Sequence, residues 1–308
     1  MSLQWIDGAE LRRTLPFPVA VAALADAVTR PGTLSGTPPR QIVDTTAGQL
    51  LLMPAEIAPY AGVKVVTVAP GNPALGLPRI NGVYLLFDSA TLVPIAQFDA
   101  AALTVVRTAA VSALAVGRLA PAEASRLVVF GAGPQAYAHV EAIAAVRPLR
   151  SVRVVTRTPD RAPAVVEWVL RLGLAASAGS PDSIADADLV ACCTTARQPL
   201  FDSSRLPAES TVVAIGSHEP DARELDPALV RHATVVVESR ASAATAGDLV
   251  LAGDPAELVA GDLADLVAGR VTPLPGRPRV FKSVGEAWED LVVAAAAYTR
   301  VSAASHDR

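Results

Sequence analysis

The chain has 308 residues, of which 51% are hydrophobic and 18% charged, and its formal net charge is −4. This apolar content excludes an intrinsically disordered chain, which lacks the surface to offset its ordering entropy, and the length favours two domains. The negative charge argues against a dedicated nucleic-acid binder, because no basic stripe is available to neutralise phosphates.

No uninterrupted apolar run approaches the roughly 20 residues that span a bilayer, and the first residues lack the basic-then-apolar order of a secretory signal. We therefore expect no membrane partner and a cytoplasmic location. Cys192 and Cys193 are adjacent in a predicted strand, so their side chains point to opposite faces and a disulfide between them is not expected. Two cysteines and four scattered histidines form no zinc pattern, and we expect no metal.

In chain order, residues 1–115 mix short strands with turns that contain glycine, proline and asparagine. Strands are predicted at 49–53, 62–68 and 83–88. An alanine-rich helix without proline is predicted at 103–119, and Pro121 closes it.

From residue 126 the pattern changes to apolar strands separated by helices. Near-continuous Val, Leu and Ile runs, rather than alternation, are typical of a parallel sheet covered on both faces. The last predicted helix is expected to return to the N-terminal domain, which makes that domain discontinuous: 1–118 plus 284–308, around an inserted domain of 119–283. The predicted strands are 127–130, 152–155, 189–192, 211–216 and 233–238, and the helices are 136–145, 161–172 and 284–301.

A glycine-rich hexapeptide follows the first of these strands and opens a helix. The pattern is G-x-G-x-x-A, in which the first glycine permits a tight turn, the second lets backbone approach a pyrophosphate, and the small last residue lets the helix lie close to the sheet. Free backbone N–H groups and the helix dipole then favour the phosphates. The pattern predicts a nicotinamide dinucleotide site formed by Gly131, Ala132, Gly133, Pro134, Gln135 and Ala136.

The end of the second strand bears on the choice of cofactor. NAD-binding units usually carry an acidic residue there for the ribose hydroxyls, whereas this chain has Thr156, Arg157 and Thr158. Arg157 can pair with a 2′-phosphate, so we expect a preference for NADP(H), with NAD(H) as the alternative. Arg157 as a solvated surface residue is the competing interpretation.

Outside the dinucleotide unit the chain resembles the ornithine cyclodeaminase/mu-crystallin family over nearly its whole length. Order and spacing both fit that family, except that Ala90-Thr91-Leu92 departs from its usual Thr-Gly turn. The resemblance rests on PPR (38–40), LLMPA (51–55), GVKVVTVAPGNPALGLP (62–78), LTVVRTAAVSALA (103–115), FGAGPQA (130–136), AIGSHEPDARELD (214–226) and FKSVGEAWEDL (281–291).

The resemblance implies an α/β fold in which a doubly wound Rossmann sheet is inserted into a discontinuous α+β domain for substrate binding and dimerisation. It also implies a homodimer. Members transfer hydride between NAD(P)H and the α-carbon of small amino or imino acids. Mu-crystallins bind NADPH and thyroid hormone.

By the same resemblance, Arg40, Lys64 and Arg107 fall at the positions that bind the substrate carboxylate. Fixed cationic donors suit such a carboxylate, and arginine offers a bidentate fork. Lys64 lies among apolar residues, so burial can lower its pKa and let it donate a proton to the imine nitrogen. Taken singly, each of the three cations is more commonly a surface charge.

Four further residues are assigned to the cofactor side. Thr108 and Thr194 are expected to face the cofactor by analogy, although a helix-capping role and a plain loop position are the alternatives. Lys282 and Ser283 are expected to close the nicotinamide pocket. An N-cap of the last helix is the alternative for Ser283.

One departure from the family bears on the reaction. Ornithine cyclodeaminases carry an aspartate, with a proposed acid/base role, at the position that His218 occupies here, and Glu219 is one residue away. A neutral imidazole suits cyclodeamination less well, whereas His218 can supply the one proton that imine reduction needs. A pocket-lining histidine without chemistry is the alternative. The sequence therefore favours an NAD(P)H-dependent reductase of small imino acids over an ornithine cyclodeaminase or a catalytically idle NADPH-binding protein.

Overall fold

The computed structural model describes residues 3–34, 36–216 and 219–306, and it divides into two compact units. Unit 1 comprises Met1–Arg107 and Glu286–Arg308, and unit 2 comprises Thr108–Gly285. The boundaries predicted from the sequence are 118/119 and 283/284. In the structure the first boundary instead falls within the long helix α3 (Ala100–Leu119), after Arg107. The second falls after Gly285, two residues later than predicted.

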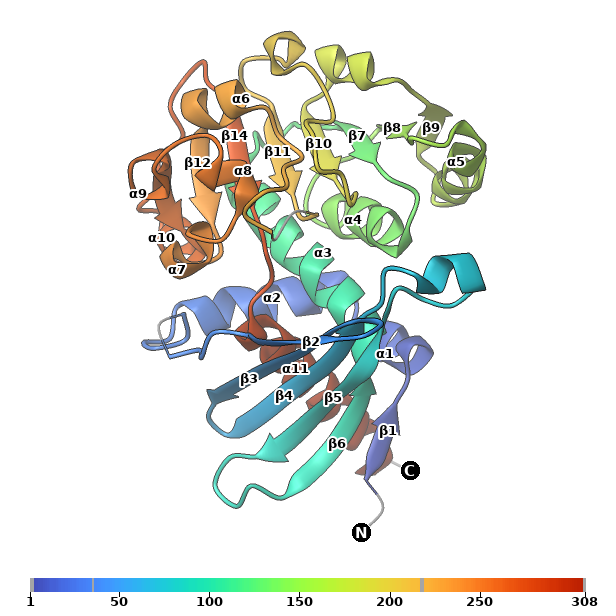
Figure 1. Ribbon diagram of the computed structural model, residues 1–308, viewed down its shortest axis with the longest axis vertical. Helices are drawn as coiled ribbons and strands as arrows, with labels where there is room; N and C mark the ends of the chain where they lie inside the picture. The colour runs from blue at the N-terminus through green and yellow to red at the C-terminus, as the bar shows by residue number, and fades with distance from the viewer. Residues whose placement is uncertain (1–2, 35, 217–218, 307–308) are drawn as a thin grey trace. The chain divides into compact units, whose positions relative to one another are not determined.

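Unit 1 is built on a six-stranded sheet in the order β1-β6-β5-β4-β3-β2 (Figure 1). β1 runs parallel to β6, and the other neighbours are antiparallel. Side chains along β3 and β4 alternate between buried and partly exposed, as expected when one face of an antiparallel sheet packs on a core. The strands are β1 (Gln4–Ile6), β2 (Gln41–Thr45), β3 (Gly48–Ile57), β4 (Tyr60–Val68), β5 (Ile80–Asp88) and β6 (Pro94–Asp99).

Helices cover one face of this sheet. α11 (Ala287–His306) packs on β3, β4 and β5, and α1 (Gly8–Thr14) and α2 (Phe17–Val28) contact α11. The C-terminal helix therefore belongs to the unit formed by the N-terminal residues, which makes that unit discontinuous. The sequence analysis found β3, β4 and β5 but missed β1, β2 and β6, since these strands are short or lack a clear apolar pattern.

The hairpin between β5 and β6 contains the segment that departs from the family's Thr-Gly turn. Leu92 adopts a φ of 55°, in the left-handed region that favours glycine. The carboxylate of Asp88 accepts hydrogen bonds from both the backbone N–H and the hydroxyl of Thr91, at 2.9 and 2.6 Å. These bonds stabilise the turn without a glycine.

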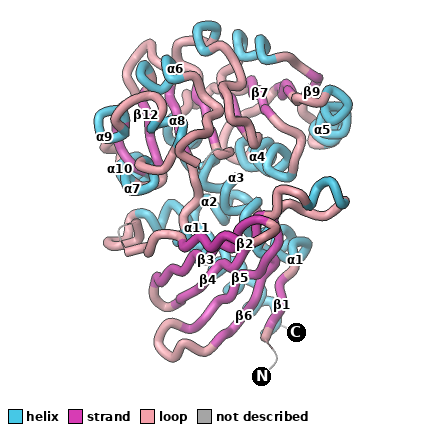
Figure 2. Tube along the Cα trace, viewed as in Figure 1, coloured by secondary structure: helices cyan, strands magenta, loops and turns pink. Residues whose placement is uncertain are grey.

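Unit 2 contains an eight-stranded sheet, all parallel, in the order β13-β12-β14-β11-β10-β7-β8-β9. Each of the two sheets belongs to one unit (Figure 2). The prediction of a Rossmann-type parallel sheet inserted into a discontinuous α+β domain is confirmed. The strands are β7 (Arg126–Phe130), β8 (Ser151–Val155), β9 (Ala175–Ala178), β10 (Leu189–Cys192), β11 (Thr211–Ala214), β12 (Thr234–Val237), β13 (Val259–Asp262) and β14 (Arg279–Lys282).

The helices of unit 2 connect these strands. Two follow the first two strands as crossover helices, α4 (Pro134–Ala144) and α5 (Ala162–Arg171), close to the predicted bounds. The others are shorter: α6 (Pro227–His232), α7 (Arg240–Ala243), α8 (Gly247–Val250), α9 (Pro255–Leu258) and α10 (Leu263–Val267). Strands β9, β13 and β14 escaped prediction because their four-residue sequences AASA, VAGD and RVFK lack an apolar run.

The strand order defines where a ligand is expected to bind. Taken as the first five strands of the unit, β9-β8-β7-β10-β11 has the order 3-2-1-4-5, so the chain reverses direction across the sheet between β7 and β10. In open parallel sheets, ligands bind beyond the carboxyl ends of the strands at such a switch point. A ligand is therefore expected beside the loops that follow β7 and β10.

Helix α3 also bears on the membrane expectation. Among the described residues it is the one helix long and apolar enough, by length and composition, to cross a bilayer, although no uninterrupted apolar run marks it in the sequence. In the structure 72% of its apolar window is buried inside the protein. Such burial is typical of a core helix.

Candidate active site

Two of the three predicted substrate cations lie in one buried cluster of unit 1. Lys64 on β4 is 2% exposed and Arg107 on α3 is 6% exposed. Both contact acidic side chains of α11: Lys64 Nζ is 2.6 Å from Asp290 Oδ2, and Arg107 Nη1 is 2.6 Å from Glu289 Oε2. Arg107 Nε is also 3.3 Å from Asp290 Oδ1, so Asp290 bridges the two cations.

The cluster perturbs Lys64 in a way that suits proton transfer. Burial, the largest cause, lowers the pKa of Lys64 from 10.5 to about 8, with a smaller contribution from the charge of Arg107, while Asp290 and Glu289 act in the opposite direction. An ammonium carries three N–H donors, of which Asp290 accepts one. Lys64 is therefore a buried acid poised near neutral pH.

Tyr84 extends the cluster and was missed by the sequence analysis. It lies directly opposite Lys64 in the β4–β5 pair, is fully buried, and its hydroxyl has no hydrogen-bond partner among the described residues. Burial, followed by the charge of Asp290, raises the pKa of Tyr84 well above its usual value. A Cβ on Gly62 would come within 2.1 Å of the Tyr84 hydroxyl, so glycine at position 62 leaves room for it.

Glu289 and Asp290 were missed as well, although both are fully buried. The signal was present: two adjacent acidic residues in GEAWEDLVVAAAA, on a helix whose other neighbours are small or apolar. Buried carboxylates are rare unless paired, so their position in an apolar helix predicts cationic partners. What the sequence does not supply is which cations those partners are.

Arg40, the third predicted cation, precedes β2 and is half-buried. The β2–β3 register begins with Gln41 opposite Leu52, and the next residue of β3, Met53, pairs with Lys64. Arg40 therefore lies just before the strand that pairs with β3, and β3 neighbours the strand of Lys64.

In unit 2 the glycine turn lies at the predicted switch point. Gly131 has a φ of 116°, and a Cβ there would come within 2.4 Å of the Cys193 carbonyl oxygen, so both conformation and space require glycine. Its N–H donates to the Val155 carbonyl at 2.9 Å. The turn after β7 is thus packed directly against the loop after β10.

The space around Gly133 is open, whereas the space around Gly131 is filled. A Cβ at Gly133 would meet nothing within 4 Å, and this residue is the N-cap of α4 without any side-chain hydrogen bond to the first turn. Pro134 is the first residue of the helix, and Ala136 is fully buried. An uncapped helix N-terminus facing open space fits the pyrophosphate of a dinucleotide.

A buried histidine holds this helix in place. His139 Nδ1 is 2.8 Å from the Gln135 carbonyl oxygen and Nε2 is 2.9 Å from the hydroxyl of Ser112 on α3. A carbonyl only accepts, so Nδ1 carries the proton and Nε2 accepts from Ser112. Burial lowers the pKa of His139 to about 4, which keeps the ring neutral near pH 7.

The other predicted cofactor residues have varied surroundings. Thr108 is buried beside Arg107 on α3, and Arg157 is exposed beyond β8, next to Thr156, whose hydroxyl donates to the Thr158 carbonyl at 2.9 Å. Thr194 follows β10, and both its N–H and its hydroxyl donate to Glu224, at 3.0 and 2.5 Å.

Lys282 and Ser283 both make buried polar contacts, and the structure excludes one of the two roles predicted for Ser283. Ser283 is buried and its hydroxyl donates to Glu238 at 2.6 Å; since α11 begins at Ala287, the N-cap alternative for Ser283 is wrong. Lys282 is 1% exposed and its Nζ is 3.0 Å from Asp248 Oδ2, which makes it part of a buried ion pair.

His218 lies outside the described residues. Glu219, its neighbour, forms an exposed ion pair with Arg197, which also pairs with Asp221. Within residues 3–34, 36–216 and 219–306, no group of three or more His, Cys, Asp or Glu side chains is arranged to hold a metal ion.

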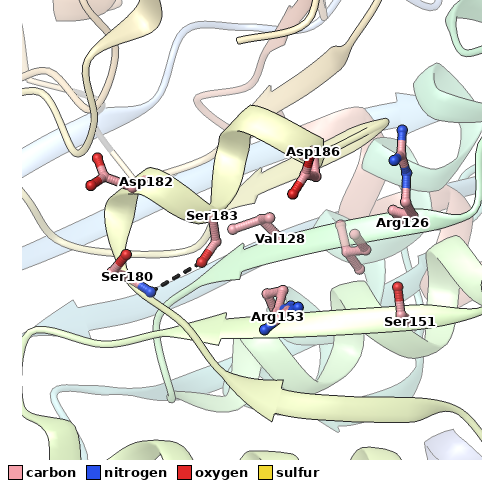
Figure 3. Close-up of a pocket in the computed structure, with 10 residues that line it drawn as sticks. Arg126, Val128, Ser151, Arg153, Ser180, Asp182, Ser183 and Asp186 are labelled. Atoms are coloured by element: carbon pink, nitrogen blue, oxygen red, sulfur yellow. Dashed lines mark hydrogen bonds between the residues drawn. The ribbon is translucent and has the colours of Figure 1, made fainter. Parts of the chain in front are cut away.

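A hollow of about 440 Å³ lies elsewhere in unit 2, and Figure 3 shows its lining. It includes Arg126 and Ser151, the first residues of β7 and β8, so it lies at the amino ends of the strands. Arg126 is already paired with Asp188 at 2.6 Å. The hollow is therefore at the opposite edge of the sheet from the glycine turn and is no part of the dinucleotide site.

Comparison with known proteins identifies the family. The sequence profile of the ornithine cyclodeaminase/mu-crystallin family matches residues 22–305. The chain belongs to this family. The mouse (Mus musculus) ketimine reductase mu-crystallin is 32% identical over 294 residues, which cover 92% of this chain and 91% of that protein.

Two further similarities concern Δ1-pyrroline-2-carboxylate reductases. A Bacillus cereus enzyme is 36% identical over 199 residues, which cover 63% of this chain and 61% of that protein. The chain thus matches about three fifths of that relative's length. The structure of the Thermococcus litoralis enzyme in complex with NADH and L-proline is 27% identical, covers 98% of both chains and has a TM-score of 0.92.

The contrast between the two glycines generates a prediction. Gly133→Ala should fold with wild-type stability, because its Cβ meets nothing, yet raise the dissociation constant for NADPH at least about tenfold, because the Cβ intrudes where backbone approaches phosphate. Gly131→Ala should lower the unfolding free energy by about 2 kcal/mol, because it strains the backbone. Thermal unfolding and fluorescence titration measure the two effects. Wild-type NADPH affinity in Gly133→Ala would contradict the assignment.

Proposed function

We propose that this protein is an NAD(P)H-dependent reductase of small imino acids, of the ketimine or Δ1-pyrroline-2-carboxylate type. The observation that carries the proposal is the buried cluster in which Asp290 bridges Lys64 and Arg107. Burying two cations costs desolvation free energy even when they are paired, so their retention in the core favours a function for them. Fixed cationic donors suit the α-carboxylate of an amino or imino acid. The names of the mouse, B. cereus and T. litoralis proteins support this choice of substrate class.

The dinucleotide site fits the cofactor that this chemistry needs. The open position at Gly133 and the uncapped start of α4 suit a pyrophosphate, and Gly131 provides the turn. Bound there, a reduced nicotinamide dinucleotide supplies the hydride for the imine carbon.

The remaining requirements are met by side chains of unit 1. Arg107, with Arg40, holds and orients the substrate carboxylate through its guanidinium fork. Lys64 adds a third cation and, protonated below a pKa of about 8, donates a proton to the imine nitrogen. Hydride on carbon and a proton on nitrogen convert the C=N bond into the CH–NH group of an amino acid. Asp290 fixes the Lys64 ammonium and keeps it in a single position.

Two other functions are the alternatives to this one. Ornithine cyclodeamination needs a group that orients the δ-amino nitrogen, and His218 stands where the family's cyclodeaminases have an aspartate. A binding protein without catalysis needs no cationic clamp for its ligand, whereas Lys64 and Arg107 are kept in the core.

An assay at the NADPH absorbance band distinguishes these functions. We expect NADPH oxidation with pyrroline-2-carboxylate or piperideine-2-carboxylate, and little with pyruvate plus ammonia. Conversion of ornithine to proline with release of ammonia and no net change in NADPH would instead establish a cyclodeaminase. NADPH binding without turnover of any of these compounds would indicate a binding protein without catalysis.

The pKa of Lys64 predicts the pH dependence of the reductase. Lys64 is charged and able to donate below pH 8, so kcat/KM should fall as the pH rises through about 8. Lys64→Arg keeps a positive charge at any accessible pH, so this variant should lose activity but also lose the alkaline limb. The measurement is kcat/KM for pyrroline-2-carboxylate from about pH 6 to 10, a range that brackets the titration. An unchanged alkaline limb in Lys64→Arg would assign the titration to another group.

For the cofactor we propose a preference for NADPH that depends on Arg157. Its exposed side chain is free of any acidic neighbour in the Thr156-Arg157-Thr158 segment and suits a 2′-phosphate. Arg157→Ala should raise the KM for NADPH about tenfold and leave the KM for NADH unchanged. Arg153→Ala, which removes an exposed arginine of β8, the strand that precedes Arg157, is the matched control. A wild-type KM lower for NADH than for NADPH would end the proposal.

We also propose a homodimer formed through the six-stranded sheet of unit 1. The face of this sheet opposite α11 is apolar and only partly buried in the single chain: Val43 is 50% and Trp5 47% exposed. Such a face is typical of a sheet that packs on a second copy about a two-fold axis. The same face includes Leu50, Leu52, Val63, Val65, Val83 and Leu85, all partly exposed.

In light scattering the wild type should therefore have twice the chain mass of 31.7 kDa. Val65→Glu places a charge at the middle of this face and should shift the protein toward monomer at micromolar concentration. Leu75→Glu, at a site that is 74% exposed away from the sheet, is the control and should stay dimeric. A monomeric wild type would refute the proposal.

A further inference from the structure

We propose that Glu224 is a positioning residue for the cofactor: its carboxylate joins the loops after β10 and β11 and sets Thr194 for the nicotinamide half of the dinucleotide. The inference rests on the proposed function and deepens it. In a sheet of this strand order, β7, β8 and β9 form one mononucleotide-binding half, and β10 and β11 begin the other.

The geometry of Glu224 joins two loops with one side chain. Glu224 is fully buried. Its Oε1 accepts from the N–H of Thr194 at 3.0 Å and from the Thr194 hydroxyl at 2.5 Å, and its Oε2 accepts from the N–H of Gly216 at 2.7 Å. Parallel strands leave such N–H groups unpaired where they end, and a carboxylate accepts several of them at once.

Gly216 shows how closely the two loops approach. A Cβ at this position would lie 1.9 Å from the Thr194 carbonyl oxygen and 2.7 Å from Glu224 Oε1. Only glycine lets the loop after β11 pass the Thr194 carbonyl and the carboxylate at this distance. The close approach of the two loops is therefore set by the backbone, and the Glu224 side chain joins them.

The backbone of Glu224 is held by Asp248 on α8, which is paired in turn with Lys282 of β14. The N–H groups of Glu224 and Leu225 donate to Asp248 Oδ1 at 2.7 and 2.8 Å, and Asp248 Oδ2 is 3.0 Å from Lys282 Nζ at the end of β14. All of these charged groups are at most 1% exposed. A continuous buried network thus runs from β14 to the loops of β10 and β11.

The same buried groups give the network a pH dependence near neutrality. Burial raises the pKa of Glu224 to about 7, against the opposing effects of Lys282 from β14 and the hydrogen bonds from Thr194 and Gly216; Asp248 from α8 acts with burial. Burial, followed by the charge of Glu224, raises the pKa values of the Cys192 and Cys193 thiols well above the usual range, so they stay neutral.

The sign follows from the hydrogen bonds. Both backbone donors aimed at Glu224 require an acceptor, so the ionised carboxylate, present above pH 7, makes the whole set, and protonation converts one acceptor into a donor. The effect on folding stability has the opposite sign. Because the pKa of Glu224 is raised in the folded protein, the folded state favours the protonated form, and the resulting stability is fully present below the unfolded pKa. This stability is lost as the pH rises through about 7. Loop order and folding stability therefore change in opposite directions with pH.

The test compares ligands that occupy one or both halves of the site. NADPH reaches the nicotinamide half, whereas 2′-phospho-ADP-ribose lacks the nicotinamide and probes the first half alone. Dissociation constants are measured by titration calorimetry from about pH 6 to 8.5, which brackets the titration of Glu224. The titration of the 2′-phosphate is common to both ligands and cancels in the ratio of their dissociation constants.

For the wild type the ratio of the NADPH constant to that of 2′-phospho-ADP-ribose should rise roughly tenfold as the pH falls from about 8 to 6. At the alkaline end Glu224→Gln should weaken NADPH roughly tenfold, leave 2′-phospho-ADP-ribose unchanged and remove the pH dependence of the ratio. Thermal unfolding at the same pH should show no loss of stability. Glu167→Gln, which alters an exposed glutamate of α5, is the matched control and should behave as wild type.

Each outcome decides between support and refutation. Equal weakening of both ligands in Glu224→Gln, or a pH dependence that persists in this variant, overturns the positioning role and leaves the proposed function intact. If Glu224→Gln does not fold, the wild-type ratio decides alone, and a ratio independent of pH refutes the proposal. If the wild type binds NADH in place of NADPH, the same ratio is taken between NADH and ADP-ribose. A wild type that binds none of these four ligands overturns the proposed function together with this inference.

Discussion

The interaction on which the core of unit 1 depends is the buried contact of Asp290 with two cations. Removing Lys64 or Arg107 from water is unfavourable, and an ion pair in a protein interior repays that penalty only when its geometry is good. Here one carboxylate is 2.6 Å from Lys64 and 3.3 Å from Arg107, and Glu289 takes a second nitrogen of Arg107. A hydrophobic cluster of similar volume would serve the core at least as well, so we infer that the charges are retained for chemistry.

Buried carboxylates also organise polar groups in unit 2, where their partners are mainly backbone N–H groups. Its parallel strands end in loops whose N–H groups have no ladder partners, and buried carboxylates accept them. Glu224 serves the loops after β10 and β11, and Glu238 accepts from Ser283 Oγ and from the N–H groups of Val284 and Gly285 after β14. In both units, then, buried acidic side chains fix the groups to which we assign a function.

This arrangement explains why imine reduction suits the chain. In the proposed reaction hydride comes from the cofactor, fixed cations hold the carboxylate of the substrate, and a single proton is needed. Burial brings the pKa of Lys64 to about 8, close to the pH at which that proton must be delivered. A cyclising deamination asks in addition for a group that orients a second nitrogen.

The sequence by itself determined the features that are local in the chain. Continuous apolar runs identified β7, β8, β10, β11 and β12 as parallel strands, and the glycine turn followed directly from Gly131 and Gly133, because strand, turn and helix start are encoded within about a dozen residues. The family motifs extended this to the choice of Lys64, Arg107 and Thr194 as site residues.

Only the tertiary structure decided which groups surround them. Lys64 and Asp290 are 226 residues apart, Arg107 and Glu289 are 182 apart, and Thr194 and Glu224 are 30 apart. No periodicity of helix or strand reaches across such separations, so the partner of a buried charge is fixed by the packing of distant elements. The pKa of a side chain such as Lys64 depends on those partners and on burial, and for that reason it too is a property of the fold.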